Sequence, residues 1–324
     1  MKQQHHKYLK ALCLKRKRCS ELVFKHNALR TTHYALRITN HAFTLIELMI
    51  ALFIGMIIIG TTYAIYISQQ RSFTSQDQVA EMNSTSKIAI DMISNDIRET
   101  GFGVPDDLRT IQRKAGCQGI NGYLQKINIV NRNDDTDEIT ILGGFRLVGN
   151  IVSDVTAGTT TLKLTNTEIL NNTDRSYISF AGTGFAIVKD IKGNTITLFN
   201  STPANKVYPS GTPVYLVENI TYQVTNRKLQ RVRRLNIGSC GTNPDIDVIA
   251  ENIDDLQIAE VDTDGDGTTD RIRINLLARA PKPDPNFQGK GNPPIQIEDR
   301  KHKQTNDGFR RRWWQMEVDL RNKI

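Results

Sequence analysis

One stretch of this 324-residue chain restricts its folding more than any other, an apolar run from Phe43 to Ile67. Every residue from Phe43 to Ile59 is apolar, Gly or Thr, except Glu47. The run exceeds the roughly 20 helical residues that span a bilayer. It is also longer than the apolar core of about 7–15 residues in a secretory signal, and no A-x-A cleavage site follows it. The sequence therefore predicts a membrane anchor.

The charge distribution changes at the start of this run. The whole chain has a formal net charge of +8. Residues 1–42 hold ten Lys and Arg residues and one acidic residue, which leaves 32 basic and 33 acidic residues for the rest. Basic residues in front of a membrane helix stay in the cytoplasm, so everything after about Ser68 is predicted to be exported. Basic clusters at 228–235 and 310–314 are interpreted as solvated strand faces, because the near-neutral exported part disfavours nucleic acid as a partner.

Glu47 is the residue of the anchor that needs an explanation. An ionised carboxylate at the centre of a membrane helix costs about 2.5–3.5 kcal/mol. Near the helix start, the carboxylate can reach the membrane interface and suits the positive end of the helix dipole. A buried cationic partner would offset its desolvation. The alternative is a glutamate that only extends its charge to the interface.

The stretch "FTLIELM" at 43–49 resembles the N-terminus of type IV prepilins. The resemblance implies that a prepilin peptidase cleaves between Ala42 and Phe43 and that Phe43 becomes an N-methylated N-terminus. It also implies that Glu47 pairs with the terminal ammonium of a neighbouring subunit during filament assembly. This chain departs from the family in one position, because Ala42 stands where Gly usually precedes the Phe.

Helical periodicity continues beyond the anchor. Apolar residues between Val79 and Ile97 recur at intervals of three, four and seven, as in an amphipathic helix. No Pro occurs between Phe43 and Val104, and "GFG" followed by Pro105 ends the pattern. We expect one long helix with a transmembrane or filament-core half at 43–67 and an amphipathic half at 68–100. Residues 1–42 are then a basic cytoplasmic leader that is removed.

The remainder, residues 101–324, is predicted to be a β-rich exported globular domain. Segments rich in β-branched residues alternate with turns, such as 192–194 and 226–228. The segment 247–261 is expected to form further strands or a short helix, and five prolines at 281–308 indicate a long loop. The predicted fold class is α+β, type IV pilin-like. The elements "ENIDDLQ", the Asp/Gly loop and the terminal "LRN" resemble PilW-like minor pilins.

The loop "DTDGDGTTD" at 262–270 is a candidate Ca²⁺ site. Its carboxylates follow the spacing of an EF-hand loop, with Gly267 at the sharp turn. The bidentate Glu is missing, because Arg273 stands at the twelfth position. An affinity of about 10⁻⁴–10⁻³ M is typical of extracellular modules, and an ion-free turn is the alternative. The candidate ligands are Asp262, Asp264, Asp266, Thr268 and Asp270.

Cysteine and histidine usage restricts the chemistry of the exported part. Cys117 and Cys240 would share an oxidising compartment, which favours a disulfide over two buried thiols. His302 is the only histidine after residue 42. No Gly-rich phosphate loop, G-x-S-x-G, H-E-x-x-H or C-x-x-C motif occurs, so we expect no enzymatic activity and no required cofactor.

These observations and the resemblance lead to a minor pilin that primes or caps a type IV pilus. Its expected partners are the prepilin peptidase, other major and minor pilins, the inner-membrane assembly platform and membrane lipid. Its expected location is the inner membrane, with a single pass, a cytoplasmic N-terminus and a periplasmic domain, and later the pilus at the cell surface. The alternatives are a minor pseudopilin of a type II secretion system and a membrane-anchored, calcium-dependent binding protein.

Overall fold

The structure of the chain is a computed structural model. It describes residues 44–104, 126–170, 176–199, 201–202, 206–234, 244–284, 287, 294–303 and 305–321. The chain divides into two compact units, residues Met1–Ile67 and Ser68–Ile324. The long helix α2 (Leu45–Arg98) contributes residues to both units. An N-terminal apolar helix followed by a β-rich domain confirms the predicted α+β fold class.

Helix α2 begins and ends where local sequence signals place its termini. Thr44 precedes the first helical residue, and the Leu48 N–H donates to the Thr44 carbonyl at 3.2 Å. The helix ends at Arg98, and Gly101 and Gly103 follow with φ of 78° and 71°. Only glycine adopts such angles without strain. A Cβ on Gly103 would also lie 2.3 Å from the Ser179 hydroxyl oxygen, so this turn requires glycine for space as well.

Within the first unit, residues 45–67 of α2 are apolar on every face and almost entirely exposed. Among the described residues, α2 is the one helix that is long and apolar enough to cross a membrane. A helix that is hydrophobic all round needs a lipid or protein environment. The predicted anchor is therefore an apolar helix whose side chains stay exposed within the first unit, as far as the structure describes that unit.

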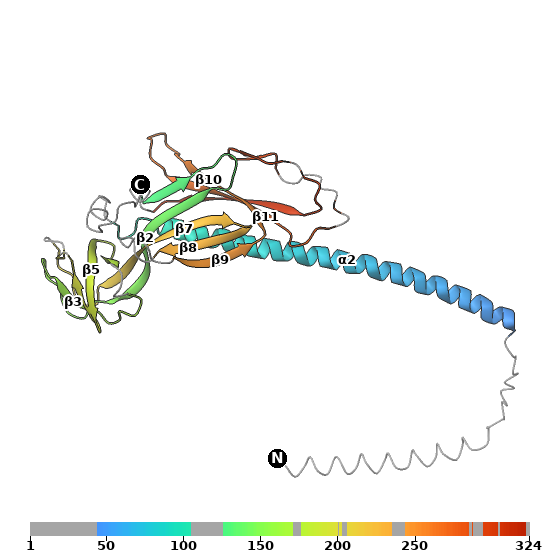
Figure 1. The fold of residues 1–324 in the computed structure, drawn as a ribbon, viewed down its shortest axis with the longest axis horizontal. Coiled ribbons are helices and arrows are strands. Elements are labelled where there is room, and N and C mark those ends of the chain that lie inside the picture. The colour runs from blue at the N-terminus through green and yellow to red at the C-terminus, as the bar shows by residue number, and fades with distance from the viewer. Residues whose placement is uncertain are drawn as a thin grey trace, which may run out of the picture. The chain divides into compact units, whose positions relative to one another are not determined.

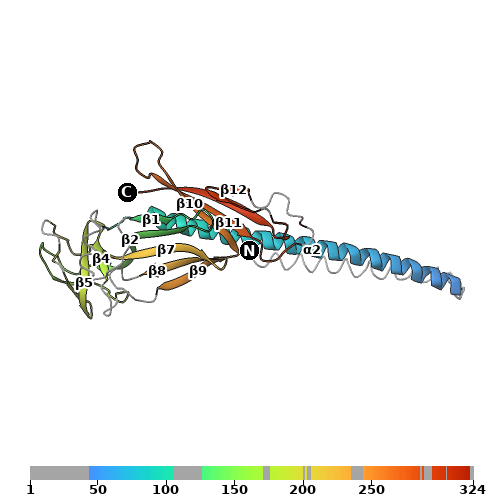
Figure 2. The ribbon, with the colours of Figure 1, turned by 45° about the horizontal axis from the view of Figure 1, so that its top comes forward.

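The second unit contains a large antiparallel sheet (Figures 1 and 2). Its strands follow the order β1-β2-β7-β4-β5-β6-β3, and β8 joins β7 to β9. Long β2 and β7 are the central pair and run through most of the sheet. The strands are β1 (Ile127–Val130), β2 (Glu138–Asn150), β3 (Thr161–Lys163), β4 (Tyr177–Phe180), β5 (Gly184–Lys192), β6 (Thr195–Leu198), β7 (Pro213–Thr225), β8 (Lys228–Arg234) and β9 (Asp245–Glu251).

Two smaller sheets complete the unit. The first has the order β10-β11-β14 and joins β10 (Ile253–Val261), β11 (Arg271–Arg279) and β14 (Arg311–Asp319). The second pairs β12 (Gln296–Ile297) with β13 (Arg300–Lys301). The Pro/Gly-rich segment at 281–308 therefore contains a short hairpin. The segment at 247–261 lies in two strands, β9 and β10, which meet at Asn252 with a φ of 61°.

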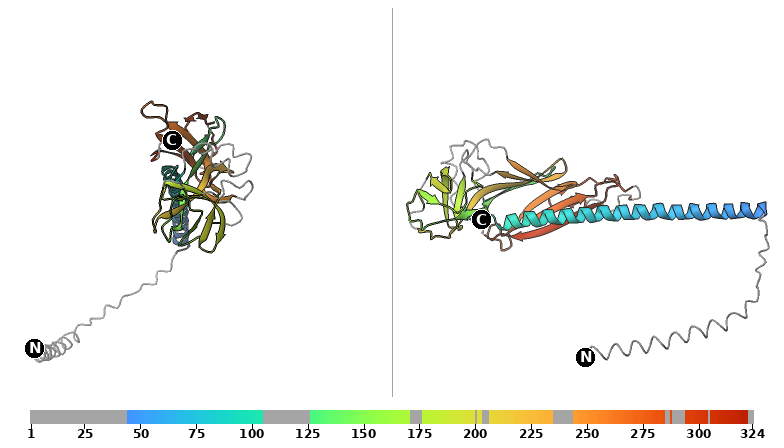
Figure 3. Two further views of the ribbon diagram at one scale, coloured as in Figure 1. Left: turned by 90° about the vertical axis from the view of Figure 1, so that its left-hand side faces the viewer. Right: turned by 90° about the horizontal axis from the view of Figure 1, so that it is seen from below.

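The amphipathic half of α2 forms one side of the main core. Met82, Ala89, Ile90, Ile93 and Ile97 are buried and pack together with residues of β1, β2, β7 and β8 from the large sheet and β10, β11 and β14 from the small sheet. Figure 3 shows this cyan part of α2 running alongside the strands. Fully burying a side chain of this size contributes about 1.5–3 kcal/mol. The predicted apolar stripe therefore fixes the helix to both sheets.

A second core lies at one end of this unit, around β3, β4, β5 and β6 (Figures 1 and 2). Its residues include Val148 from β2 and Leu216 from β7, so the central strand pair contributes to both cores. The β5–β6 hairpin turns at Gly193, which has a φ of 56°. The β7–β8 hairpin turns at Asn226 and Arg227, which have φ values of 51° and 61°. Both turns lie where the sequence predicted them.

Candidate functional site

The first candidate site is the start of α2, where Thr44 and Glu47 form a capping box. The Thr44 N–H and hydroxyl donate to Glu47 Oε2 at 2.9 and 3.0 Å. In return, the Glu47 N–H donates to Thr44 Oγ1 at 3.3 Å. This reciprocal arrangement satisfies N–H groups that the first helical turn leaves without intrahelical partners. The capping role of Glu47 was not predicted from the sequence, although the T-x-x-E spacing indicates it.

The capping box leaves part of the carboxylate accessible. Both bonds from Thr44 end on Glu47 Oε2, and Oε1 accepts none from the described residues. A carboxylate has about four lone-pair sites, so Glu47 can cap its own helix and still accept from a cation. Ala42 and Phe43, the predicted processing site, lie outside the described residues. The structure therefore describes the contacts of Glu47, whereas the cleavage position stays a prediction from the sequence.

The apolar helix after Glu47 is the second component of this site. Large side chains are exposed around the whole circumference, including Leu45, Phe53, Ile54 and Tyr63 at 77, 66, 51 and 65 %. Exposed apolar patches of this extent mark membrane or protein contacts. The charged group at the helix start and the apolar surface behind it belong to one continuous element.

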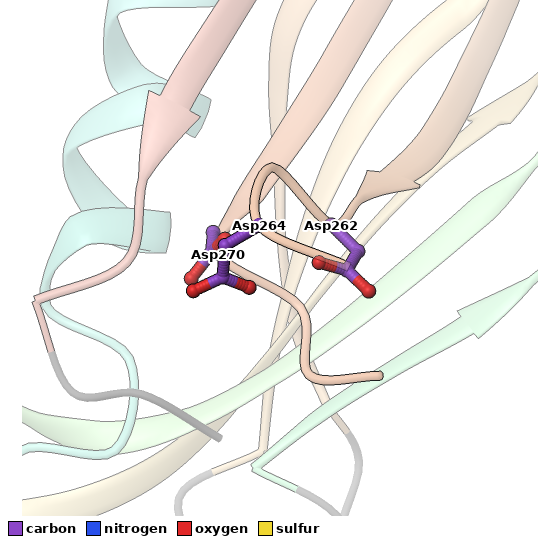
Figure 4. Close-up of side chains that lie close together, drawn as sticks. All are labelled: Asp262, Asp264 and Asp270. Carbon is purple, nitrogen blue, oxygen red and sulfur yellow. The ribbon is translucent and has the colours of Figure 1, made fainter. Parts of the chain in front are cut away.

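The Asp/Gly loop forms the turn between β10 and β11, and it brings three carboxylates together. One carboxylate oxygen from each of Asp262, Asp264 and Asp270 lies within 4.8 Å of the others. Figure 4 shows Asp264 and Asp270 side by side, with Asp262 on the other limb of the loop. Gly265 and Gly267 have φ of 77° and 83°, which permits the sharp turn. Carboxylate oxygens are the ligands that Ca²⁺ prefers.

Local hydrogen bonds already use part of these carboxylates. The N–H groups of Gly265 and Gly267 donate to Asp262 at 2.7 and 2.9 Å. The Thr263 N–H donates to Asp270 at 3.0 Å. Asp266 and Thr268, the other two predicted ligands, bond to each other, with the Thr268 N–H donating to Asp266 at 2.8 Å. The loop is exposed, and calcium binding there stays a prediction.

Acidic partners pair with most of the described arginines of the two basic clusters. In β8, Arg231 contacts Asp96 of α2 at 2.8 Å, and Arg233 contacts Asp245 and Asp247 of β9, both at 2.8 Å. Around β14, Arg310 contacts Asp284 at 2.9 Å. Guanidinium groups held in this way are less suited to phosphate contacts, which depend on free basic side chains.

Next to Arg310 in the second cluster, Arg311 forms ion pairs with Asp254 and Asp307, both at 2.5 Å. The pair with Arg311 lowers the pKa of Asp307 well below its ordinary value. In the same cluster, Trp314 packs against the main core, whereas Trp313 is 42 % exposed. One tryptophan of the pair is therefore largely structural, as the alternation of a strand predicts.

A buried polar network joins α2 to the large sheet. The Tyr222 hydroxyl of β7 donates to Asp96 at 2.6 Å, beside the Arg231 contact. Burial raises the pKa of Asp96, while the bonds from Tyr222 and Arg231 act in the opposite direction. Burial likewise raises the pKa of the Tyr222 hydroxyl. The network lies between α2, β7 and β8, so we infer that it fixes the C-terminal end of α2 to the large sheet.

Asp137 joins the edge of the small sheet to the large sheet. Its N–H donates to the Leu256 carbonyl at 2.8 Å, and its carboxylate accepts from the Ile258 N–H at 2.8 Å. The side chain therefore replaces part of a neighbouring strand along β10. Burial raises its pKa against the hydrogen bonds from Arg132 and Ile258. No spacing in the sequence marks this residue.

His302 and Arg300 reach a single buried carboxylate. Asp255 of β10 is 1 % exposed, and it contacts Arg300 and, at 2.9 Å, His302 Nε2. The Asn275 amide also donates to Glu298 at 2.8 Å. These contacts hold the β12–β13 hairpin on the small sheet. His302, the only histidine after residue 42, therefore has a structural contact in the fold. Cys117 and Cys240 lie outside the described residues, so their disulfide stays a prediction.

Comparison with known proteins identifies the N-terminal part of this arrangement. Residues 37–63 match the family model of the prokaryotic N-terminal methylation motif. No curated protein and no solved structure matches the chain. The motif covers the predicted processing site, the capping box and the start of the apolar helix. It supports a type IV pilin- or pseudopilin-like protein, whose N-terminus is processed by a prepilin peptidase and which interacts with the pilin assembly machinery.

Proposed function

We propose that this chain is a minor pilin, a structural subunit that primes or caps a type IV pilus. The observation that carries the proposal is the methylation motif at 37–63, which runs into an apolar helix whose described side chains are exposed. The β-rich domain that follows agrees with a pilin-like subunit. Most described arginines of its basic clusters are held in ion pairs, which disfavours nucleic acid as a partner. No catalytic motif occurs in the sequence, so we propose no enzymatic role.

The proposed assembly starts in the inner membrane. Basic residues 1–42 keep the N-terminus in the cytoplasm, and the β-rich domain is exported to the periplasm. The prepilin peptidase cleaves between Ala42 and Phe43, which leaves 282 residues of the 324, and Phe43 is N-methylated. The apolar helix then leaves the lipid and packs into a bundle with the helices of other pilins. The exposed apolar surface is buried in both environments.

Glu47 has two roles in this proposal. Its Oε2 caps the helix through Thr44, and its negative charge pairs with the N-terminal ammonium of a neighbouring subunit. Removing the charge leaves that ammonium in an apolar bundle without a partner to offset its desolvation. Removing only the cap costs about 0.5–2 kcal/mol of helix stability. The two roles are therefore separable by substitution.

The test compares Glu47→Gln with Glu47→Val, each as the only copy of the gene. Gln keeps the capping acceptor and loses the charge, whereas Val loses both. We expect both variants to insert into the membrane and both to be absent from sheared filaments. Thr44→Ala, which weakens the cap and keeps the charge, is the control and should enter filaments. Wild-type amounts of the Gln variant in sheared filaments would refute the pairing role.

Processing is tested independently by mass spectrometry of the membrane-resident protein. We expect a mature N-terminus at methylated Phe43. An intact leader, or cleavage after Ile67, would contradict the proposal. Ala42→Gly should speed cleavage, because the family usually carries Gly there, and a bulky residue at 42 should stop it.

A minor pseudopilin of a type II secretion system is the alternative within filament proteins. It shares the methylation motif, the anchor and a position at a filament tip. Gene neighbours distinguish the two, because a pilus cluster supports the minor pilin and an operon with a secretin and a secretion ATPase supports the pseudopilin.

A membrane-anchored, calcium-dependent binding protein is the alternative from another class. The three carboxylates of the β10–β11 loop favour this alternative. Such a protein would remain in the membrane as a single subunit. Cross-linking to other pilins through the apolar helix would exclude it.

A further inference from the structure

The face of α2 that packs in the main core continues toward the N-terminal end of the helix. Met82 and Ala89 on this face are buried, Ser75 and Gln78 are half-buried, and Arg71 is exposed. Spacings of three, four and seven residues place all five on one side of the helix. The domain therefore covers this side less and less toward Arg71.

A pocket lies at this end of the packed face, within the second unit. It has a volume of about 340 Å³ and is lined by residues of α2 between Gln70 and Gln78 and by Pro283 and Asp284. The Ser75 hydroxyl donates to Asp284 Oδ2 at 3.4 Å, which connects the two walls. Small-molecule sites have volumes of roughly 300–1,000 Å³, so the pocket can hold a group as large as a lipid headgroup.

The pocket has one charged group that other side chains do not neutralise. Among the residues that the structure describes, Arg71 forms no ion pair. Asp284 is the other charged residue of the lining, and it accepts from Arg310 Nε and Nη2 at 3.1 and 2.9 Å. Lys282, next to Pro283 in the chain, is exposed. Because the carboxylate is already paired, the remaining charge is positive and favours an anion.

The polar side chains of the lining supply further donors. The Thr74 hydroxyl donates to the Gln70 carbonyl at 2.9 Å and the Ser75 hydroxyl to Asp284, so neither is needed for a ligand. The side-chain amides of Gln70 and Gln78 each carry two N–H donors. A guanidinium group matches the geometry of a phosphate, which it can bind through two parallel hydrogen bonds.

The sequence relates Arg71 to the boundary of the membrane. Arg71 is the first charged residue after the apolar run and follows Ile67 by four residues, or about 6 Å of helix. The headgroup layer on one side of a bilayer is about 5–8 Å thick. Tyr63 and Tyr66 precede Arg71, and aromatic residues of this kind are enriched at the membrane–water interface. The anion available at this depth is the phosphate of a phospholipid.

We propose that the pocket binds the phosphate of a phospholipid headgroup at the exported face of the inner membrane. Arg71 pairs with the phosphate, and the amides of Gln70 and Gln78 donate to its other oxygens. This inference rests on the anchored state within the proposed function. The contact is lost when α2 leaves the lipid for a filament, so it stabilises the membrane-resident subunit relative to the assembled one.

The test measures lipid binding to the purified full-length chain in detergent by native mass spectrometry. The probes are phosphatidylglycerol, diacylglycerol with the same acyl chains and no phosphate, and inorganic phosphate. Arg71→Gln removes the cation. Arg98→Gln, on the same helix and outside the pocket, is the matched control. Thr74→Trp fills the pocket and keeps Arg71.

We expect wild type to bind phosphatidylglycerol more tightly than either of the other probes. Arg71→Gln and Thr74→Trp should each weaken this binding about tenfold, equivalent to about 1.4 kcal/mol. Arg98→Gln should bind as wild type does. Both pocket variants should keep the wild-type Tm, because residues 71 and 74 are exposed.

Three results would overturn the proposal. Wild-type affinity of Arg71→Gln would exclude the cation. Wild-type affinity of Thr74→Trp would exclude the pocket, because an arginine that only extends to the headgroups does not need it. Equal affinity for diacylglycerol or for inorganic phosphate would exclude recognition of a phospholipid headgroup.

Sheared filaments separate this proposal from the proposed function. If the chain is present in filaments and neither pocket variant changes lipid binding, the headgroup site is wrong and the minor pilin assignment stands. If lipid binding depends on Arg71 and the chain is absent from filaments, the headgroup site stands and the minor pilin assignment is wrong.

Discussion

The docking of α2 on the β-rich unit predicts a large difference between two isoleucines of the same helix. Ile93 is 0 % exposed and packs in the main core, whereas Ile88 is 56 % exposed. Ile93→Ala removes three buried carbon atoms, a loss of about 2.4 kcal/mol at roughly 0.8 kcal/mol for each. The cavity that remains brings the total into the range of about 2–5 kcal/mol measured for such truncations. Ile88→Ala should change stability by about 0.5 kcal/mol or less.

The pair is matched because both substitutions replace Ile by Ala within α2, so the gain in helix propensity is shared. The assay is thermal unfolding of the full-length chain in detergent, followed by the fluorescence of Trp313 and Trp314 on β14. In a unit of this size, each kcal/mol shifts Tm by about 2–4 °C. We expect a decrease of about 4–20 °C for Ile93→Ala and about 2 °C or less for Ile88→Ala. Equal decreases for the two variants would refute the assignment of the core-facing side of the helix.

Three further predictions concern the polar groups of the second unit. If the Asp/Gly loop binds Ca²⁺ with the expected weak affinity, 10 mM Ca²⁺ should stabilise the protein by about 1.4–2.7 kcal/mol in thermal unfolding, and Asp262→Asn should abolish this gain; an equal gain in the variant would exclude the loop. Arg311 lowers the pKa of Asp307, so this carboxylate adds stability above its unfolded-state pKa of about 3.9 and loses it as the pH falls. The Tm difference between wild type and Asp307→Asn should therefore shrink below about pH 4, and a difference that grows there would contradict the ion pair. Arg300→Met leaves the buried Asp255 without its guanidinium partner and should destabilise the protein by about 3–5 kcal/mol in denaturant unfolding, whereas an unchanged midpoint would show that the hairpin contact is not formed.

The features at the start of α2 can be predicted from a short stretch of sequence. The apolar run, the acidic residue near its start and the T-x-x-E spacing all act within one or two helical turns. The helix and its apolar surface were therefore predicted from the sequence. The capping box was not, although the T-x-x-E spacing is sufficient to predict it. The methylation motif at 37–63 has the same local character, so a short match is sufficient to identify it.

The strands and their turns were also largely determined by local sequence. Asn226 and Arg227, and Gly193, mark hairpins because their positive φ angles occur in tight turns. The Asp/Gly loop was predicted to contain a sharp turn, and it joins β10 and β11. Periodicity does not say which strands pair, so the order of the large sheet and the separate small sheet could not be obtained from it.

Only the tertiary structure decided which distant groups meet. The five acidic and hydroxyl residues of the loop looked equivalent in sequence, yet three carboxylates converge while Asp266 and Thr268 bond to each other. Asp96 and Arg231 are 135 positions apart, and Asp137 reaches β10 across the gap between two sheets. These contacts depend on how α2 and the sheets pack. A buried charge without a partner is costly, so each buried group pairs with a polar group that packing brings close to it.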